Sequence, residues 1–451
     1  MKKSTLFKNC LAVAIVNNAD EVIRDADIFV ENNQISAVGK NLTVQADEII
    51  NCENKIALPG FVNTHHHLFQ MLTRNLPSAQ DAKLFDWLVY HYEIWRNITP
   101  EAVHISATCA LSELLLTGCT TAADHLYLFP ENVSGELIDA EIHAAKEVGM
   151  RFHPTRGSMS RGKSAGGLPP DDVVQSEDQI IKDSIRVIDK FHNPEDFSMC
   201  RVSLAPCSPF SVTSELMRDT AKLAREKEVQ IHTHLCETID EENYCIEIYE
   251  KRPLEYMESL DWLGDDVWFA HGIYFNDDEI KKLGETKTGI AHCPSSNLRL
   301  GSGIAPVRKL LNAGARVGLA VDGSASNDSS NMLQEVQRCM FIHRIKSGVD
   351  SMPAKDALRI ATRGGAEVLG RNDIGSIEPG KAADIVLFDL NSLAYAGAMS
   401  DPVAALLFCG YDHRAWLTMV NGRIVVRDKQ LVGIDQFELK RKADKIAKGL
   451  I

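Results

Sequence analysis

Short apolar runs and amphipathic stretches of helical period alternate along most of this chain. Eight apolar runs end in polar residue types, at positions 61–67, 120–125, 151–157, 202–207, 229–235, 267–272, 288–294 and 317–323. Helical patterns separate them, for example at positions 101–116, 136–148, 177–191 and 215–227. Strands that alternate with crossover helices are typical of a parallel sheet, and eight such units predict a (β/α)8, or TIM, barrel with its active site at the carboxyl ends of the strands.

The two ends of the chain have a different pattern, in which short alternating strands follow one another with turn residues between them. Such runs occupy positions 11–16, 22–30, 34–38 and 48–51 before the barrel, and 383–390 and 416–428 after it. The last run contains a hairpin turn at Asn421 and Gly422, and a charged helix begins near Phe437. We predict an α/β protein with a barrel over residues 58–375 and a small β-sandwich formed by both chain ends, residues 1–57 and 376–451.

Composition narrows the class of protein. The chain has 451 residues, of which 45% are hydrophobic and 24% charged, as in a globular protein with a large core. Its net charge is −14 and it contains no basic block, so we expect no nucleic-acid partner. No apolar run approaches the length of a membrane span, and eleven cysteines without a C-x-x-C pair suit reduced thiols. We expect a cytoplasmic protein that does not enter a membrane.

Histidines and one aspartate stand at the ends of three predicted strands. Side chains alternate across a strand, so His65 and His67 point one way while His66 points the other. His234 ends the fifth strand and Asp322 ends the eighth. Three imidazoles and one carboxylate around a water suit a catalytic Zn²⁺ or Fe²⁺. We predict one divalent metal per chain, with zinc preferred over iron, held by His65, His67, His234 and Asp322.

The order of these motifs resembles the amidohydrolase superfamily. PGFVNTHHH, HTHLCET, AHG, HCPSSN and VDGSASND follow one another as in its mononuclear deaminases, which act on cytosine, guanine or S-adenosylhomocysteine. Binuclear branches usually place a carboxylated lysine at the end of strand four, and the absence of lysine from VSLAPC here favours one metal. The loops after strands one and three resemble those of 8-oxoguanine deaminases and of relatives that act on isocytosine or hydroxytriazines.

The resemblance implies a hydrolytic deamination. The metal lowers the pKa of its bound water towards about 7, so that hydroxide can attack the carbon that carries an exocyclic amine. In the family pattern, Glu237 takes the proton of the water and passes it to a ring nitrogen. His271 orients or polarises the water, and Asp322 helps to protonate the departing ammonia.

The expected substrate is 8-oxoguanine, which would give urate and ammonia. Isocytosine, guanine, S-adenosylhomocysteine and a hydroxytriazine stay open as alternatives, since the same ligands serve them all. A remote alternative is a catalytically silent barrel that acts as an assembly scaffold, but the chain has every ligand and Glu237. Family precedent favours a homo-oligomer.

Recognition of the heterocycle is expected from side chains after several strands. Gln70 can donate and accept at adjacent atoms, which suits a ring edge with a carbonyl beside an N–H, and Arg156 could bind a carbonyl oxygen. We predict a substrate-binding set of Gln70, Arg156, His125, Cys207 and Asn297.

Other polar residues near the motifs have plainer interpretations. His66 and His232 suit packing, or support of a neighbouring ligand, better than ligation, and His292 suits support of the pocket. The acidic pair Glu241 and Glu242 is most simply a solvated surface.

Overall fold

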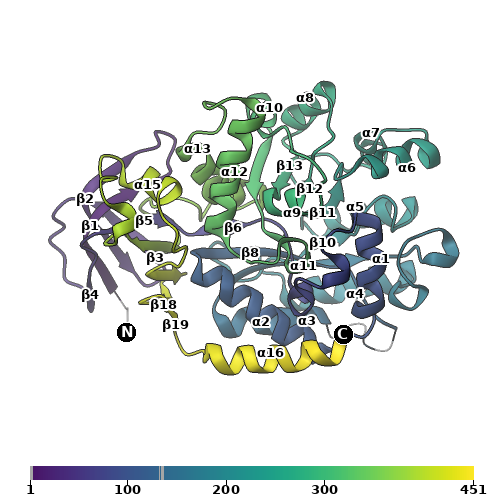
Figure 1. Ribbon diagram of the computed structural model, residues 1–451, viewed down its shortest axis with the longest axis horizontal. Helices are drawn as coiled ribbons and strands as arrows, with labels where there is room; N and C mark the ends of the chain where they lie inside the picture. The colour runs from purple at the N-terminus through teal and green to yellow at the C-terminus, as the bar shows by residue number, and fades with distance from the viewer. Residues whose placement is uncertain (1–3, 132, 134–136) are drawn as a thin grey trace.

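The barrel predicted from the eight apolar runs is confirmed. The computed structural model describes residues 4–131, 133 and 137–451 (Figure 1). Eight parallel strands close in the order β10-β11-β12-β13-β14-β6-β8-β9, and each overlaps one predicted run. They are β6 (Phe61–Asn63), β8 (Cys119–Leu126), β9 (Arg151–Ser158), β10 (Ser203–Pro206), β11 (Ile231–Leu235), β12 (Val267–His271), β13 (Gly289–His292) and β14 (Arg316–Leu319).

Helices follow the strands and cover the outside of the barrel (Figure 1). In α4, Ser176 and Gln179 form a reciprocal capping box, and Ile180, Val187 and Ile188 are buried, as an amphipathic helix requires. None of the described helices is long and apolar enough to cross a membrane. The helices are α1 (Leu84–Trp95), α2 (Pro100–Leu116), α3 (Leu137–Val148), α4 (Glu177–Phe191), α5 (Ser214–Glu226), α6 (Ile239–Tyr249), α7 (Pro253–Glu258), α8 (Asp277–Thr286), α9 (Pro294–Arg299), α10 (Val307–Ala313), α11 (Ser324–Asn327), α12 (Met332–Ser347), α13 (Ala354–Arg359), α14 (Gly365–Val368), α15 (Pro402–Phe408) and α16 (Gln436–Leu450).

Short helical turns connect several of these elements. The turn η1 (Leu68–Thr73) matters most for the site, because it directly follows the histidines after β6. A short parallel pair, β7 (His66–His67) and β15 (Asp322–Gly323), lies beside it. The other turns are η2 (Pro77–Ala79), η3 (Lys163–Ala165), η4 (Asp171–Val173), η5 (Ile360–Gly364) and η6 (Leu393–Tyr395).

Both chain ends join in one nine-stranded sheet, as the alternating runs at the two ends predict. The order is β19-β18-β17-β16-β5-β1-β2-β3, and β4 pairs with β1. Antiparallel pairing of β5 with β16 connects the two ends, and residues from both fill one separate hydrophobic core. The strands are β1 (Ser4–Ala14), β2 (Val22–Glu31), β3 (Gln34–Gly39), β4 (Glu48–Asn51), β5 (Lys55–Pro59), β16 (Ile385–Asp389), β17 (Leu417–Val420), β18 (Arg423–Arg427) and β19 (Gln430–Leu431).

The hairpin between β17 and β18 turns at the predicted Asn-Gly pair. Asn421 has φ 48° and Gly422 has φ 78°, so both central residues have the positive φ that a type I′ turn needs. A Cβ at Gly422 would lie 1.9 Å from the Asn32 carbonyl oxygen, so only glycine fits against the turn between β2 and β3.

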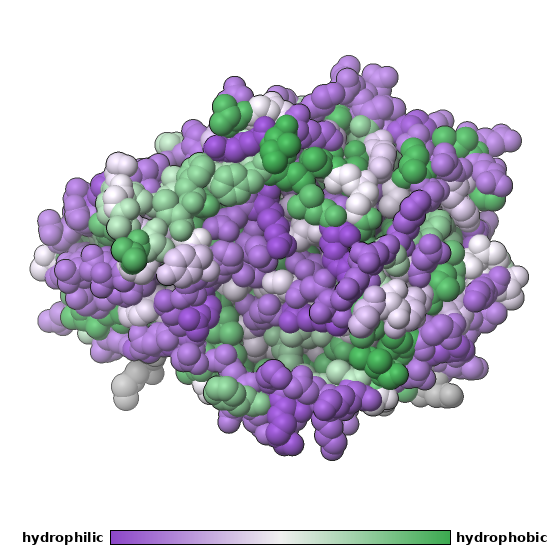
Figure 2. Space-filling model, viewed as in Figure 1, coloured by the Kyte–Doolittle hydropathy of each residue, from purple (hydrophilic) through white to green (hydrophobic). Residues whose placement is uncertain are grey.

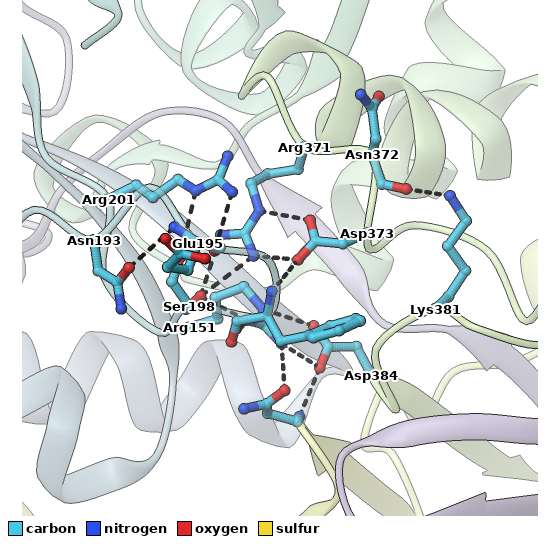
Figure 3. Close-up of polar contacts among 12 residues, drawn as sticks. Arg151, Asn193, Glu195, Ser198, Arg201, Arg371, Asn372, Asp373, Lys381 and Asp384 are labelled. Carbon is cyan, nitrogen blue, oxygen red and sulfur yellow. Dashed lines mark hydrogen bonds and ion pairs between the residues drawn. The ribbon is translucent and has the colours of Figure 1, made fainter. Parts of the chain in front are cut away.

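A buried network of charges ties this sheet to the barrel (Figure 3). Arg151, the first residue of β9, donates from Nε and Nη2 to the two carboxylate oxygens of Asp384, each at 3.0 Å. Its Nη1 donates to the carbonyls of Phe197 and Ser198, at 2.8 and 2.7 Å. Asp384 also accepts the backbone N–H of Asn421 at 2.6 Å. The network lies where the barrel strands begin, at the end of the barrel opposite to the site.

Replacing Arg151 with Met should destabilise the fold, because Asp384 would remain buried without its cation. We expect a loss of about 3–5 kcal/mol in the free energy of unfolding, measured by chemical denaturation. Arg427→Met is a control, because Arg427 pairs with Glu48 at an exposed edge of the sheet, and its loss should cost about 0–1 kcal/mol. Equal losses in the two variants would contradict this role of Arg151.

Candidate active site and metal centre

Four side chains converge at the carboxyl ends of the barrel strands. His67 Nε2 lies 3.1 Å from His234 Nε2, and Asp322 Oδ1 lies 3.2 Å from His65 Nε2 and 3.4 Å from His67 Nε2. The side chains of His65, His67 and Asp322 are at most 5% exposed, and His234 is partly exposed. The structure therefore brings together the four ligands predicted from the sequence.

Backbone carbonyls fix the tautomers of two of the histidines. His67 Nδ1 lies 2.7 Å from the carbonyl oxygen of His125, and His234 Nδ1 lies 2.6 Å from that of Cys207. A carbonyl only accepts, so each Nδ1 carries the proton and each Nε2 keeps a lone pair. Two lone pairs that face each other at 3.1 Å repel unless a cation lies between them.

The third histidine is oriented through a neighbouring ring. His232 Nδ1 donates to the Trp268 carbonyl at 2.8 Å, so its Nε2 accepts from His65 Nδ1 at 2.7 Å. His65 Nε2 is then deprotonated, and it is buried without a hydrogen-bond partner. The sequence-based expectation that His232 supports a ligand agrees with this geometry.

The spacing of the ligand atoms fits one metal ion. Ligand atoms that lie 2.0–2.1 Å from one zinc ion, at angles close to tetrahedral, are separated by about 3.3 Å. The three recorded separations of 3.1, 3.2 and 3.4 Å lie close to that value. His65, His67, His234 and Asp322 could therefore hold one divalent cation.

The protonation of this group also suits a cation. Burial lowers the pKa of the imidazoles of His65 and His67, and it lowers that of His234 to about 3, so the three rings are neutral at pH 7. Burial opposes ionisation of Asp322, but contact with His65 and the field of His271 hold its pKa well below the usual range. Three neutral imidazoles and one carboxylate are the donor set that a catalytic metal needs.

Glu237 and His271 lie beside this group. His271 Nε2 is 3.5 Å from Glu237 Oε2 and 4.0 Å from Asp322 Oδ2, and its Nδ1 lies 2.9 Å from Asn297 Oδ1. Burial raises the pKa of Glu237 to about 7, although His271 opposes the shift. Burial lowers the pKa of His271, but Glu237 and Asp322 outweigh it and raise that pKa above its usual value. Both groups can therefore exchange protons near neutral pH.

Three non-glycine residues of the site have left-handed backbones. Cys236, His271 and Asp322 have φ angles of 56°, 72° and 64°. Such conformations are costly for residues with a side chain and persist where the surroundings enforce them. The backbone strain therefore lies at or next to Glu237, His271 and Asp322.

A pocket opens onto these groups. Gln70 and Cys207, both predicted to bind substrate, line it together with Glu237, His271 and Asp322. A Cβ at position 323 would lie 2.0 Å from Gln70 Oε1, so Gly323 makes the room that the Gln70 amide occupies. Apolar and aromatic side chains form much of the remaining wall, namely Leu84, Trp87, Leu88, Tyr92, Tyr127 and Phe210.

The structure does not bring Arg156 to this pocket. Its Nε donates to Asp183 Oδ2 and its Nη2 to Gln175 Oε1, both at 2.7 Å, and Nη1 donates to the Gly157 carbonyl. The guanidinium also lies 3.8 Å from the centre of the Phe129 ring. A buried cation needs its carboxylate close by, and Asp183 on α4 supplies it away from the pocket. Arg156 is thus directed outwards, against the expectation of substrate contact.

Two further predicted residues lie behind the pocket wall. His125 is fully buried, stacks on His234 at 4.9 Å between ring centres, and directs Nε2 to the Ala205 carbonyl at 2.9 Å. Asn297 orients His271 through the contact given above. Neither residue is among those that line the pocket, so both support residues that do.

Sequence reasoning missed two features of the pocket. Glu241 is only 1% exposed and lines the pocket, which corrects its interpretation as a solvated residue, and Glu242 is half-buried in an ion pair with Arg252. The signal was present, because Thr238 and Glu241 have the spacing of a capping box. Trp87 and Tyr92 on α1 also line the pocket. They come from the long connection after the first barrel strand, and the sequence does not show which side chains of that connection face the pocket.

Comparison with known proteins agrees with this geometry. The sequence pattern of the amidohydrolase family matches residues 56–425. The chain belongs to the amidohydrolase family. This amidohydrolase is 44% identical to an 8-oxoguanine deaminase of Pseudomonas aeruginosa, over 99% of both chains. It is 34% identical to the hydroxydechloroatrazine ethylaminohydrolase of Pseudomonas sp. strain ADP, over 99% of this chain and 96% of the relative.

A solved structure extends the match to three dimensions. The atrazine chlorohydrolase of Arthrobacter aurescens TC1, solved with zinc, superposes on the amidohydrolase with a TM-score of 0.94 at 34% identity. The match covers 98% of this chain and 100% of that one. Together, these relatives confirm the predicted fold and the prediction of a hydrolase that acts on C–N bonds.

Replacing His232 with Phe should weaken metal binding by the amidohydrolase about 10- to 100-fold, because His65 would lose the acceptor that fixes its tautomer. Metal retention during titration with a chelator measures this change. His153→Phe is a matched control, since His153 is also buried, its Nε2 lies 3.3 Å from Arg371 Nη1, and it lies away from the pocket. Unchanged retention in the His232 variant would show that His65 needs no such support.

Proposed function

We propose that this amidohydrolase is a zinc-dependent 8-oxoguanine deaminase that releases urate and ammonia. The observation that carries the proposal is 44% identity, over nearly the whole length, to an 8-oxoguanine deaminase, combined with a complete set of converging site residues. The complete site weighs against a silent scaffold, which needs neither a donor set for a metal nor a buried acid beside it.

His65, His67, His234 and Asp322 would hold the metal. When bound, zinc supplies a water whose pKa lies near 7 and so provides hydroxide at neutral pH. The same donor set accepts Fe²⁺, and the zinc in the structure of the atrazine chlorohydrolase supports zinc here.

Glu237 is the proposed proton carrier. Burial raises its pKa to about 7, so the carboxylate can accept a proton from the water and give it to a ring nitrogen. His271, held at Nδ1 by Asn297, orients the water. Asp322 would then take the remaining proton of the attacking hydroxyl group and deliver it to the amine as the C–N bond breaks, so that water is consumed and ammonia is released.

Gln70 is the proposed contact for the edge of the heterocycle, with Cys207 beside it. The Gln70 amide fits beside Gly323 because that residue has no Cβ. The amide has one donor group and one acceptor atom, which suit a ring edge that carries a carbonyl beside an N–H. The aromatic wall supplied by Trp87 and Tyr127 suits the faces of a planar ring.

A hydroxytriazine is the second candidate substrate. It is favoured by the 34% identity to the ethylaminohydrolase, which covers nearly the whole of both chains. Isocytosine, guanine and S-adenosylhomocysteine would use the same ligands and complete the series of alternatives.

We also propose that the protein is a cytoplasmic homo-oligomer. Apolar side chains gather over α12 and α15 on the face shown in Figure 2, where Phe341, Ile345 and Phe408 are 46%, 86% and 48% exposed. An exposed apolar patch of this kind suits burial against a second subunit. The cysteines, all within the described ranges and none in a disulfide there, suit a reducing compartment.

The proposed substrate can be tested by ammonia release from metal-replete protein. The panel comprises 8-oxoguanine, guanine, isocytosine, cytosine, S-adenosylhomocysteine and a hydroxytriazine. We expect 8-oxoguanine to give a kcat/KM above about 10⁴ M⁻¹s⁻¹, an ordinary value for a true substrate. Faster turnover of a hydroxytriazine would favour the second candidate, and silence across the panel would refute the substrate class.

Glu237→Gln tests the proposed chemistry. The amide cannot carry the proton, so we expect kcat to fall by a factor of about 10² or more while metal content remains at wild-type level. Metal analysis and ammonia release on the same preparation separate the two effects. Wild-type turnover would rule out Glu237 as the proton carrier.

A further inference from the structure

Glu241 makes an unusual pair of contacts at the start of α6. Its Oε1 accepts the backbone N–H of Cys236 at 2.9 Å, and its Oε2 accepts that of Glu237 at 3.1 Å. The helix begins after Thr238, whose hydroxyl oxygen lies 3.4 Å from the Glu241 backbone nitrogen as an N-cap acceptor. In a capping box the glutamate would accept the N–H of the N-cap residue itself. Here the carboxylate reaches further back, to the two residues that lead into the helix.

The position of this carboxylate is not explained by charge pairing. In the part of the chain that the structure describes, no ion pair of Glu241 is recorded, whereas the adjacent Glu242 pairs with Arg252. A carboxylate that is 1% exposed and lacks a cation is costly to bury. The two backbone N–H groups are its compensation, so the acid and the turn at Cys236 depend on each other.

The turn held by Glu241 carries the proposed proton carrier. Cys236 has a left-handed backbone with φ 56°, and the chain bends there so that Glu237 enters the pocket. Left-handed conformations cost free energy for a residue with a side chain. Two hydrogen bonds from consecutive N–H groups to the Glu241 side chain stabilise this bend and fix the peptide from which the Glu237 side chain departs.

The same turn also supports His271. The Cys236 carbonyl accepts the backbone N–H groups of Ile273 and Tyr274, at 2.8 and 3.2 Å. These residues form the turn directly after His271, whose own φ is 72°. One buried carboxylate is therefore connected, through a single peptide unit, to the backbones that present both Glu237 and His271.

We propose that Glu241 is a positioning residue, whose carboxylate holds the Cys236 turn and thereby aims Glu237, and through the Cys236 carbonyl His271, at the substrate. The inference rests on the proposed function of Glu237. It adds a residue that takes no proton from substrate and holds no metal, yet sets the geometry on which proton transfer depends.

Glu241→Gln tests the inference with little change in side-chain volume. In the variant, the NH2 group of the glutamine replaces one of the two accepting oxygens. It cannot accept the N–H of Cys236 or of Glu237, so one of the two hydrogen bonds is lost. A misplacement of about 1 Å costs up to about 10²-fold in rate, so we expect kcat to fall about 10- to 100-fold. KM should change by less than about threefold, because the contacts of Gln70 with the ring are kept. Metal content should remain at wild-type level.

Two controls separate positioning from loss of the helix start. Glu242→Gln removes a charge from the adjacent, half-buried position, and Thr238→Val removes the N-cap oxygen without touching the N–H groups of Cys236 and Glu237. Both should keep kcat within about twofold of wild type, at temperatures well below unfolding. A fall in kcat in Thr238→Val equal to that in Glu241→Gln would overturn the inference, because it would assign the effect to helix stability.

A double variant shows whether Glu241 acts through Glu237. In a Glu237→Gln background, adding Glu241→Gln should lower kcat by a smaller factor than it does in the wild type, because only its effect through His271 remains, whereas independent effects would multiply in full. Multiplied effects, or wild-type kcat in Glu241→Gln, would overturn the inference alone. Wild-type turnover in Glu237→Gln would instead overturn the proposed role of Glu237 in catalysis, and the inference with it.

Glu241→Asp covers the case in which the glutamine variant does not fold. It keeps the carboxylate but shortens its reach by one methylene, so it should fold, retain metal and lose kcat. If both variants lose metal or unfold, Glu241 is a structural residue only and the inference is wrong.

Discussion

Backbone carbonyls of the barrel decide which nitrogen of each histidine faces the centre of the site. The carbonyls of His125 and Cys207 take the Nδ1 protons of His67 and His234, and that of Trp268 acts on His65 through His232. These carbonyls belong to strands or lie directly after them, so their positions are set by closure of the barrel. A change in strand register would remove these carbonyl contacts, so that an Nε2–H group could replace the Nε2 lone pair. The metal-binding donor set would then be lost although every histidine is still present.

The buried Arg151–Asp384 network and the candidate active site lie at opposite ends of the barrel. Where the strands begin, Arg151 and Asp384 satisfy each other, and the charges are fully paired. Where the strands end, lone pairs face one another, burial holds the pKa of Glu237 at about 7, and three turns have strained backbones. A barrel can tolerate such a site because the compensating interactions are remote from it.

The predictable part of the molecule is the part governed by local pattern. Eight strands and the convergence of His65 with His67 follow from alternation along a strand, which needs no knowledge of neighbours. The orientation of Arg156 depends on Asp183, a residue on another element that sequence cannot pair with it. Glu241 is an intermediate case, because its capping-box spacing was visible, but its reach to Cys236 depends on a left-handed turn that has no signature in sequence.

The wall of the pocket has a different origin from its chemistry. Gln70, Trp87 and Tyr92 come from one segment between β7 and α2, while the groups proposed to bind a metal and carry protons come from the strand ends. Relatives named for deamination, for loss of an ethylamine and for loss of chloride share this architecture. Much of the pocket wall can therefore change within this one segment, while the strand ends that carry the proposed metal ligands keep their structure.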